Sequence, residues 1–301
     1  MPEINPNTHA GTQWTIIKLL QWAASYLKKH DIDSPRATGE ILLAHALNCE
    51  RIELYLSFDQ PLVDDELQAF KTLIQRRVRR EPVAYILGVK EFWSLDFEVN
   101  GDVLIPRPET ECLVEMALDT LSRLASGQSW RILELGTGCG AIIISLAVEQ
   151  PRHTYFASDR SIPAVRVACR NARRHHRGEK IHFFNADWLA PLNRNRSSFN
   201  LIISNPPYIP SGVIAGLQPE IHNYEPIAAL DGSGDGLKSY QEIIGGAHQY
   251  LEPDGVLLLE IGHDQCEDVR RLVDNSGHYR DFKCTKDYSG HHRVVQMHKM
   301  N

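Results

Sequence analysis

The sequence predicts an α/β protein, in which a doubly wound, mostly parallel sheet of seven strands follows a small all-helical domain. From about residue 130 onward, short apolar and β-branched runs alternate with amphipathic segments, as expected for strands joined by crossover helices. Residues before about 90 show helical spacing of apolar side chains and no strand pattern. The third observation is a strand that ends at Asn205-Pro206-Pro207-Tyr208, because open α/β sheets bind ligands at the carboxyl ends of their strands.

Size and composition are ordinary for a globular protein, with 301 residues of which 43% are hydrophobic and 23% charged. No stretch approaches the roughly 20 apolar residues that cross a bilayer, and residues 1–6 lack the features of a signal peptide. We therefore expect a cytoplasmic protein with no membrane partner. The net charge of −6 disfavours stable binding to nucleic acid. Nothing in the sequence signals the oligomeric state, and a monomer is the simplest expectation.

The cysteines and histidines predict no metal site. The six cysteines include no Cys-x-x-Cys pair and no Cys/His spacing typical of zinc. The fourteen histidines include two adjacent pairs, at 175–176 and 291–292, and adjacent residues do not face one another on a helix or a strand. We expect reduced thiols and no bound metal.

Four helices are expected in the N-terminal domain, which we place at residues 1–88. Apolar side chains recur at helical spacing, and the lysines at the end of the first helix oppose its dipole. Nothing in this domain looks catalytic. The expected helices span residues 14–30, 35–47, 51–56 and 64–78.

A hairpin linker is expected over residues 89–104, where apolar and polar residues alternate. The third domain spans residues 105–301 and begins with a stiff loop, because prolines stand on both sides of Arg107. Pro108 is expected to open a helix that runs to about Ser126. The loop is therefore either a plain helix start or a preorganised edge of a ligand pocket.

The third domain carries the predicted sheet. Its last two strands are close together in the sequence and are expected to pair antiparallel. The strands are expected at residues 130–135, 153–158, 180–185, 199–204, 254–260, 279–284 and 292–298. The helices are expected at residues 139–149, 161–175, 237–251 and 264–275.

A glycine-rich turn, Gly136-Thr137-Gly138-Cys139-Gly140, follows the first strand of this sheet. Glycines at this bend let the backbone approach a nucleoside-type ligand without a Cβ clash. The spacing differs from the dinucleotide fingerprint, and the turn lacks the Gly-Lys-Ser/Thr of a phosphate loop. A ligand without phosphate groups fits better, and a turn without any ligand is the alternative.

The next strands also end in polar or aromatic groups. Asp159 follows the glycine turn by about 20 residues, the distance at which a carboxylate binds ribose hydroxyls. Asp187 could accept a hydrogen bond from an adenine amino group, and Trp188 could stack on its ring. With Asn205, four successive strand ends point to a single ligand site.

The prolines of Asn205-Pro206-Pro207-Tyr208 remove two backbone donors, so the ladder of the strand cannot continue there. The side-chain oxygen of Asn205 and the carbonyl of Pro206 could accept both N–H hydrogens of an NH2 group. Tyr208 could pack against the plane of that group. A plain strand-ending turn is the alternative.

Together these motifs resemble those of class I methyltransferases that use S-adenosylmethionine, whose domain is Rossmann-like. Within that class the chain is similar, over residues 14–298, to the release factor glutamine methyltransferases of the HemK/PrmC family. The residues that carry the resemblance are Glu134-x-Gly136-x-Gly138-x-Gly140, Asp159, Asp187 and Asn205-Pro206-Pro207-Tyr208, with Glu81 to Gly88, Glu91-Phe92, Leu104 to Glu111, Tyr224-Glu225-Pro226, Lys286 to Gly290 and Arg293. The chain departs from the family at Glu134 and Cys139, where Asp and Ser or Thr are commoner, and at Trp93-Ser94, which replaces an aromatic-Gly pair.

The resemblance implies an activity. The glutamine of the Gly-Gly-Gln motif in class I peptide chain release factors would be methylated on its amide nitrogen, in support of translation termination. S-adenosylmethionine would be the cofactor and S-adenosylhomocysteine its product, and the N-terminal domain would dock the release factor. The implied catalytic residues are Asn205, Pro206 and Tyr208, with Pro207 as a further substrate contact. The implied cofactor contacts are Gly136, Thr137, Gly138, Cys139, Gly140, Asp159, Asp187, Trp188 and Asn205.

Other functions use similar sequence features. A ribosomal protein glutamine is the nearest alternative substrate, and an amino group of DNA or RNA is the next. A DNA enzyme would usually need a basic recognition region and room to flip a base. A nicotinamide dehydrogenase is disfavoured by the glycine spacing, and a binding module without activity by the intact Asn-Pro-Pro-Tyr motif.

Overall fold

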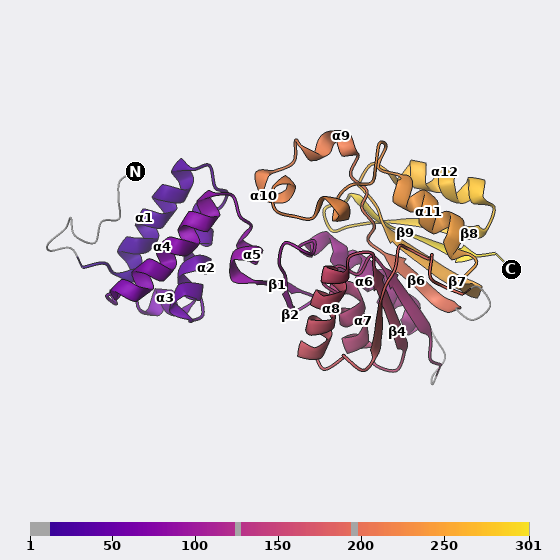
Figure 1. Ribbon diagram of the computed structural model, residues 1–301, viewed down its shortest axis with the longest axis horizontal. Coiled ribbons are helices and arrows are strands. Elements are labelled where there is room, and N and C mark those ends of the chain that lie inside the picture. The colour runs from indigo at the N-terminus through magenta and orange to yellow at the C-terminus, as the bar shows by residue number, and fades with distance from the viewer. Residues whose placement is uncertain (1–12, 124–127, 194–197, 301) are drawn as a thin grey trace. The chain divides into compact units, whose positions relative to one another are not determined.

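The computed structural model describes residues 13–123, 128–193 and 198–300, and the chain divides into two compact units, Met1–Leu87 and Gly88–Asn301 (Figure 1). No helix in these described ranges is long and apolar enough to span a bilayer.

The described part of the first unit is all helical, and its apolar faces enclose one core in which Leu27, Leu42 and Phe70 are buried. The four predicted helices are present. The fifth was not predicted, because five residues contain too little of a helical period to stand out. The helices are α1 (Ile16–Lys29), α2 (Pro35–Leu47), α3 (Glu53–Leu56), α4 (Asp64–Val78) and α5 (Val83–Leu87).

A buried carboxylate joins α2 to the segment that contains α3. Glu40 is 1% exposed, and its oxygens lie 2.9 Å from Nε of Arg36 and 2.8 Å from Nη2 of Arg51. The hydroxyl of Tyr55 donates to the same carboxylate. Because the charge is paired and hydrogen-bonded, its burial is tolerated in this small unit.

Seven strands form the sheet of the second unit, in the order β5-β4-β3-β6-β7-β9-β8. The first five pair in parallel, whereas β9 lies antiparallel between β7 and β8. The predicted α/β class, the mostly parallel sheet and the antiparallel final pair are confirmed. The strands are β3 (Arg131–Leu135), β4 (Thr154–Asp159), β5 (Ile181–Asn185), β6 (Phe199–Ser204), β7 (Leu251–Glu260), β8 (Tyr279–Lys286) and β9 (His292–Lys299).

Helices cover both faces of this sheet. Figure 1 shows α6, α7 and α8 on one side of it and α11 and α12 on the other. The helix predicted from Pro108 begins as a 3-10 turn, Pro108–Thr110, and continues as α6; residues 124–126 of that prediction lie outside the described residues. The helices are α6 (Glu111–Ser122), α7 (Ala141–Glu149), α8 (Ile162–Arg174), α11 (Lys238–Ala247) and α12 (Cys266–Ser276).

The hairpin of β1 (Val89–Phe92) and β2 (Leu95–Glu98) packs on α8. Trp93 and Ser94 form its two-residue turn with φ of 52° and 56°, as a turn matched to the strand twist requires. A glycine adopts this conformation without a Cβ penalty, which explains why an aromatic-Gly pair is usual here. Ser94 departs from that pair. Nε of Arg170 donates to the carboxylate of Glu98 at 2.9 and 3.0 Å and ties the hairpin to the helix.

A loop clamps the segment that follows β6. Ile209 and Asp231 form a parallel bridge, in which the amide of Gly232 donates to the carbonyl of Ile209 at 2.9 Å. Gly236 has a φ of 77°, and a Cβ added to it would lie 2.4 Å from the carbonyl oxygen of Tyr208. The backbones therefore approach so closely that only glycine fits at this position.

Replacing Gly236 with alanine should test this clamp. We expect Gly236→Ala to destabilise the protein by about 2–4 kcal/mol, because the new methyl group meets the carbonyl of Tyr208 in a left-handed backbone conformation. Gly234 is the matched control, since a Cβ there meets nothing within 4 Å. Urea unfolding followed by circular dichroism measures both variants. Equal unfolding midpoints for Gly236→Ala and Gly234→Ala would contradict the clamp.

Candidate active site

A cavity lies at the carboxyl ends of β3, β4, β5 and β6. Its empty volume, which includes space open to solvent, is about 810 Å³. Six of the predicted cofactor-binding residues line this cavity: Gly136, Gly138, Asp159, Asp187, Trp188 and Asn205. The other lining residues include Asp102, Val103, Leu104, Arg160, Ser161, Ala164, Ala186, Pro207, Pro226, Ala228 and Ala229.

The glycines of the turn after β3 have different physical roles. Gly136 has a φ of 70°, and the ring of Trp188 lies 3.6 Å from the place that a Cβ would occupy. Gly140 lies behind the cavity and has a φ of 85°. A Cβ added to it would lie only 2.8 Å from Cδ1 of Ile144. Gly136 thus shapes the cavity wall, whereas Gly140 permits the close start of α7.

Three predicted cofactor contacts are not among the residues that line this cavity: Thr137, Cys139 and Gly140. Thr137 is buried, and its hydroxyl donates to the carboxylate of Glu134. Cys139 is buried as well, and its carbonyl accepts a 2.9 Å hydrogen bond from Nδ2 of Asn171. Burial raises the pKa of Glu134 to about 8. Glu134 and Cys139 therefore support the turn from inside the protein.

Asp159 has both carboxylate oxygens held in place by the backbone. Its Oδ2 accepts from the amide of Gly138 at 2.9 Å, and its Oδ1 accepts from the amide of Ser161 at 2.8 Å. Burial raises the pKa of this carboxyl group. A carboxylate oxygen can accept more than one hydrogen bond, so Asp159 retains capacity for ligand hydroxyls on the cavity side.

A second cavity meets the first at the end of β6. Its empty volume is about 600 Å³, and the segment Asn205 to Ile209 forms much of its wall. Four residues line both cavities: Leu104, Asn205, Pro207 and Ala229. The predicted amide-binding residues Pro206 and Tyr208 line the second. Asn205 therefore stands where two binding spaces join.

The amide of Asn205 is oriented from behind. Its Nδ2 donates to the hydroxyl oxygen of Thr110 at 3.3 Å, which leaves Oδ1 as the available acceptor. Thr110 is buried at the start of α6. In the described part of the chain, no donor is paired with the carbonyl of Pro206. Two acceptors are thus free next to each other.

Glu260, the last residue of β7, is a site residue that the sequence analysis missed. It is 2% exposed and lines the second cavity. Its Oε2 has no hydrogen-bond partner among the described residues, and the neighbouring hydroxyl of Thr110 lowers the pKa of the carboxyl group against the larger effect of burial. Burial raises the pKa of Glu260 to about 7. The sequence signal that could have identified Glu260 is a single acidic residue at the end of the apolar run that precedes Ile261.

A buried ion pair fixes one wall of the second cavity. Arg107 pairs with Glu225, whose other oxygen accepts from the amide of Ile105 at 3.2 Å. Glu225 is 4% exposed, and Arg107 lines the cavity. The stiff loop is therefore an edge of a pocket as well as a helix start.

Tyr208 is held by Gln265, another residue that the sequence analysis missed. Nε2 of Gln265 donates to the carbonyl of Tyr208 at 3.0 Å, while its Oε1 accepts from the amide of Gly262 at 2.9 Å. Burial raises the pKa of Tyr208 to about 12, so its hydroxyl stays protonated at neutral pH. Its ring remains available as one wall of the second cavity.

Two family models match the chain. The PrmC N-terminal domain matches residues 18–88, and the methyltransferase small domain matches residues 114–215. A solved methyltransferase from Pyrococcus furiosus is similar in fold, with a TM-score of 0.51 and 19% identity over 75% of this chain and 99% of that one. This likeness supports the assignment of the fold alone.

Curated relatives align over almost the whole length. The release factor glutamine methyltransferase of Geobacter sulfurreducens is 42% identical over 94% of this chain and 96% of that protein. The release factor glutamine methyltransferase of Chlorobaculum tepidum is 39% identical over 92% of this chain and 94% of that protein. A bifunctional methyltransferase of Rickettsia typhi is 38% identical, and the chain spans 58% of its length. With these relatives and the site at the end of β6, the chain belongs to the release factor glutamine methyltransferase family.

Proposed function

We propose that this protein methylates the side-chain amide nitrogen of the glutamine in the Gly-Gly-Gln motif of class I peptide chain release factors. The observation that carries the proposal is the position of Asn205, which borders both cavities. One cavity would hold the methyl donor and the other the glutamine side chain. Curated relatives that align over most of the chain bear the name of this activity.

The first cavity fits the cofactor of methyltransferases, S-adenosylmethionine. Asp159 offers a fixed carboxylate for ribose hydroxyls, and Trp188 beside Asp187 offers a ring and an acceptor for an adenine base. Gly136 lets the backbone come close to the ligand. When bound, S-adenosylmethionine supplies an electrophilic methyl group and leaves as S-adenosylhomocysteine.

The second cavity supplies acceptors for an amide NH2 group. Oδ1 of Asn205 and the carbonyl of Pro206 would each accept one N–H hydrogen of the glutamine. The ring of Tyr208 would pack against the amide plane. An amide nitrogen is a weak nucleophile because its lone pair is delocalised into the carbonyl group. Holding it in a fixed orientation lowers the entropic part of the barrier, and the two acceptors favour the pyramidal nitrogen of the transition state.

Thr110 and Glu260 would keep these acceptors aligned. Thr110 receives a hydrogen bond from Asn205, so its hydroxyl fixes which end of the Asn205 amide faces the substrate, and it also neighbours the carboxyl group of Glu260. The unpartnered Oε2 of Glu260 is a further acceptor for the second cavity. An alkylated amide nitrogen is strongly acidic and sheds its proton readily, so no dedicated base is needed.

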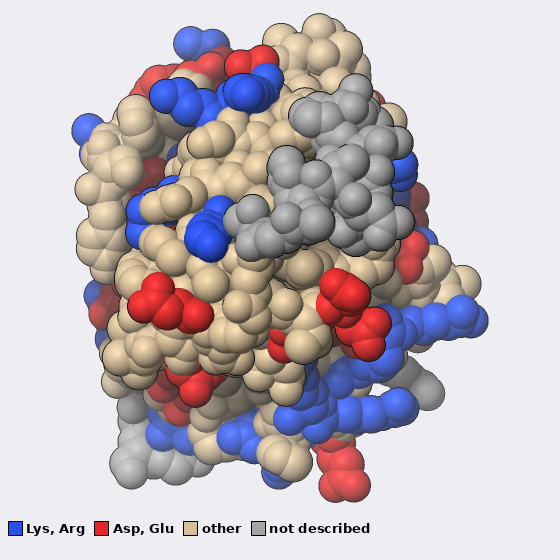
Figure 2. Space-filling view, turned by 90° about the vertical axis from the view of Figure 1, so that its left-hand side faces the viewer, with Lys and Arg blue, Asp and Glu red and all other residues tan. Residues whose placement is uncertain are grey.

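The face drawn in Figure 2 gives no positive reason to prefer nucleic acid as the substrate. On the face of the molecule drawn in Figure 2, Lys and Arg side chains are interspersed with Asp and Glu among a larger area of other residues. A continuous basic stripe is the usual footprint of a nucleic-acid-binding protein. The ribosomal-protein and nucleic-acid alternatives are best separated by direct competition.

Labelled S-adenosylmethionine tests the substrate. The protein is incubated with a release factor, a ribosomal fraction and DNA, and we expect label on the Gly-Gly-Gln peptide of the release factor. Asn205→Ala should abolish turnover and weaken cofactor binding without eliminating it, because Asn205 borders both cavities. Label confined to nucleic acid or to a ribosomal protein would reject the proposed substrate. Near-normal turnover by Asn205→Ala would reject the role of that residue.

Thr110→Val tests the alignment of Asn205. We expect a fall in kcat of about 10-fold to 100-fold with an unchanged KM for S-adenosylmethionine, since one hydrogen bond in the acceptor cavity is lost. Thr120→Val is the matched control: Thr120 is also a buried threonine of α6, and its hydroxyl donates to the carbonyl of Met116. Steady-state kinetics measure kcat and KM for both variants. A similar loss in both variants would point to general destabilisation.

We infer that the N-terminal unit docks the release factor, in addition to the contacts at the active site. Its described surface exposes large apolar side chains: Ile52 is 66% exposed, Leu56 80% and Val63 61%. A protein partner that covered these side chains would remove their apolar surface from water. The match of residues 18–88 to the PrmC N-terminal domain supports a role specific to this family.

Leu56→Ser tests this docking surface. We expect kcat/KM for the intact release factor to fall several-fold, while that for a short Gly-Gly-Gln peptide stays unchanged, because the peptide lacks the rest of the factor that would contact the N-terminal unit. Gln68→Ala replaces an exposed polar residue of α4 and serves as the control. Equal effects of Leu56→Ser on factor and peptide would remove the docking role.

A further inference from the structure

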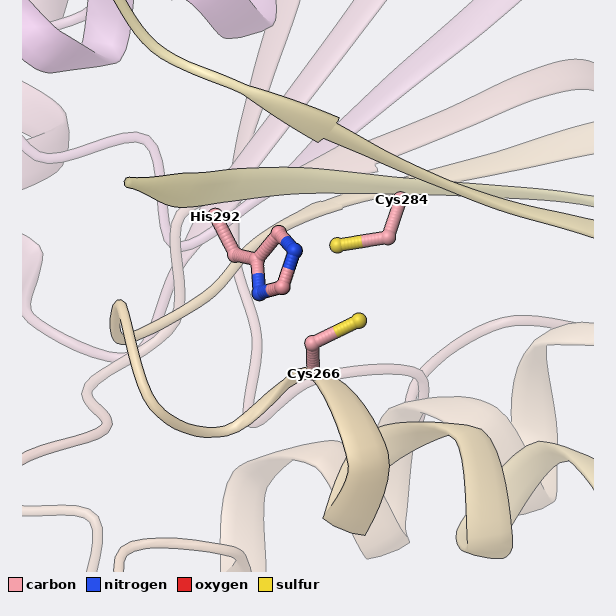
Figure 3. A group of neighbouring side chains, drawn as sticks. All are labelled: Cys266, Cys284 and His292. Carbon is pink, nitrogen blue, oxygen red and sulfur yellow. The ribbon is translucent and has the colours of Figure 1, made fainter. Parts of the chain in front are cut away.

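Three side chains that can bind a metal ion converge away from the cavities described above. They are Cys266, Cys284 and His292, and Figure 3 shows the two sulfur atoms and the imidazole ring pointing toward one another. The two Sγ atoms and a ring nitrogen all lie within 4.8 Å of one another. No Cys/His spacing in the sequence indicated this group, because the fold assembles it from separate elements.

Each side chain comes from a different element. Cys266 is the first residue of α12, Cys284 lies on β8 and His292 begins β9. The antiparallel pairing of β8 and β9 places His292 opposite Lys286, two residues from Cys284. The group thus joins a helix on one face of the sheet to its final hairpin.

The separations fit tetrahedral coordination after a small contraction. With Zn–S bonds of about 2.3 Å and Zn–N bonds of about 2.0–2.1 Å, tetrahedral ligand atoms lie about 3.5–3.8 Å apart. The structure's upper bound of 4.8 Å exceeds this by about 1 Å, which rotation of the side chains can supply. Two thiolates and one imidazole form a ligand set that zinc accepts, with water in the fourth position.

The surroundings are compatible with a cation. Cys266 is 4% exposed, whereas Cys284 and His292 are half-buried, so one side of the group stays open to solvent. Glu267 and Arg270 are the nearby charged groups, and they form an ion pair of 3.7 Å with each other. Their charges therefore offset one another, so the net charge at the site is set by the three ligands themselves. A divalent cation would neutralise the two thiolates, whose protons pass to solvent on binding.

We propose that Cys266, Cys284 and His292 form a binding site for Zn²⁺. The imidazole nitrogen favours a metal over a simple pair of thiols, because it completes a three-ligand set with both sulfur atoms. The proposal does not depend on the methyl-transfer reaction.

An ion at this site would also steady the candidate active site. Gln265 stands immediately before Cys266 and donates its side-chain amide to the carbonyl of Tyr208. Fixing Cys266 to the β8–β9 hairpin would fix the start of α12 and with it the position of Gln265. Zn²⁺ would thus act on Tyr208 through packing and hydrogen bonds.

Co²⁺ is a suitable probe, because it replaces Zn²⁺ and absorbs light in a way that reports its ligands. The full-length protein is stripped with a chelator, reduced and titrated with Co²⁺ without oxygen. We expect one ion per chain, tetrahedral visible bands and a thiolate charge-transfer band, all removed by added Zn²⁺. We also expect Zn²⁺ to raise the melting temperature.

Variants make the test specific. Loss of an outer-shell partner alone lowers metal affinity about 10–100-fold, so Cys284→Ser and His292→Asn should lower it at least that far. Cys169→Ser replaces a half-buried cysteine of α8 outside the group and should bind normally. Circular dichroism confirms that each variant is folded, and the Zn²⁺-dependent rise in melting temperature should vanish in Cys284→Ser.

Three results would overturn the proposal. The first is a Co²⁺ spectrum without tetrahedral and thiolate bands. The second is Zn²⁺ affinity that stays unchanged in Cys284→Ser. The third is a Cys266–Cys284 disulfide in air together with no Zn²⁺ uptake by the reduced protein, which would identify a redox pair.

Discussion

The hydrogen bond from Asn205 to Thr110 is the interaction on which the candidate active site depends. It joins the end of a central strand to the start of α6, and the hydroxyl of Thr110 also neighbours Glu260 at the end of the adjacent strand. Three segments distant in the sequence thereby meet around one amide group. Because the amide nitrogen of Asn205 is held by Thr110, the side-chain oxygen is the acceptor left available on a residue that borders both cavities.

The segment that follows β6 is also held by close contacts along its backbone. The loop that contains Gly232 and Gly236 lies against Tyr208 and Ile209, and Gln265 holds the carbonyl of Tyr208 from the other side. A rigid acceptor is useful for a weak nucleophile, because little entropy remains to be lost on binding. Preorganisation here comes from packing of the main chain as much as from the side chains.

Much of the fold could be predicted from the sequence, because strands and helices of the sheet domain are regular and long enough to show their periods. Side chains at strand ends, such as Asp159 and Asn205, could be placed for the same reason. Thr110 and Glu260 could not, since their meaning depends on contacts across the sheet that no local pattern contains. Cys139 is another case: its place in the glycine turn predicts a ligand contact made mainly by its backbone, and its side chain is buried.

The position of β9 has a consequence for how the chain folds. This strand is the last in the described sequence, yet it lies between β7 and β8, so β8 has no partner in the sheet until residues 292–299 are made. The sheet therefore cannot be completed while its earlier strands are being synthesised. A chain cut short before His292 would lose one strand and leave another as an unpaired edge. Completion of this enzyme's sheet thus waits until β9 has been synthesised, after all of the other strands of the sheet.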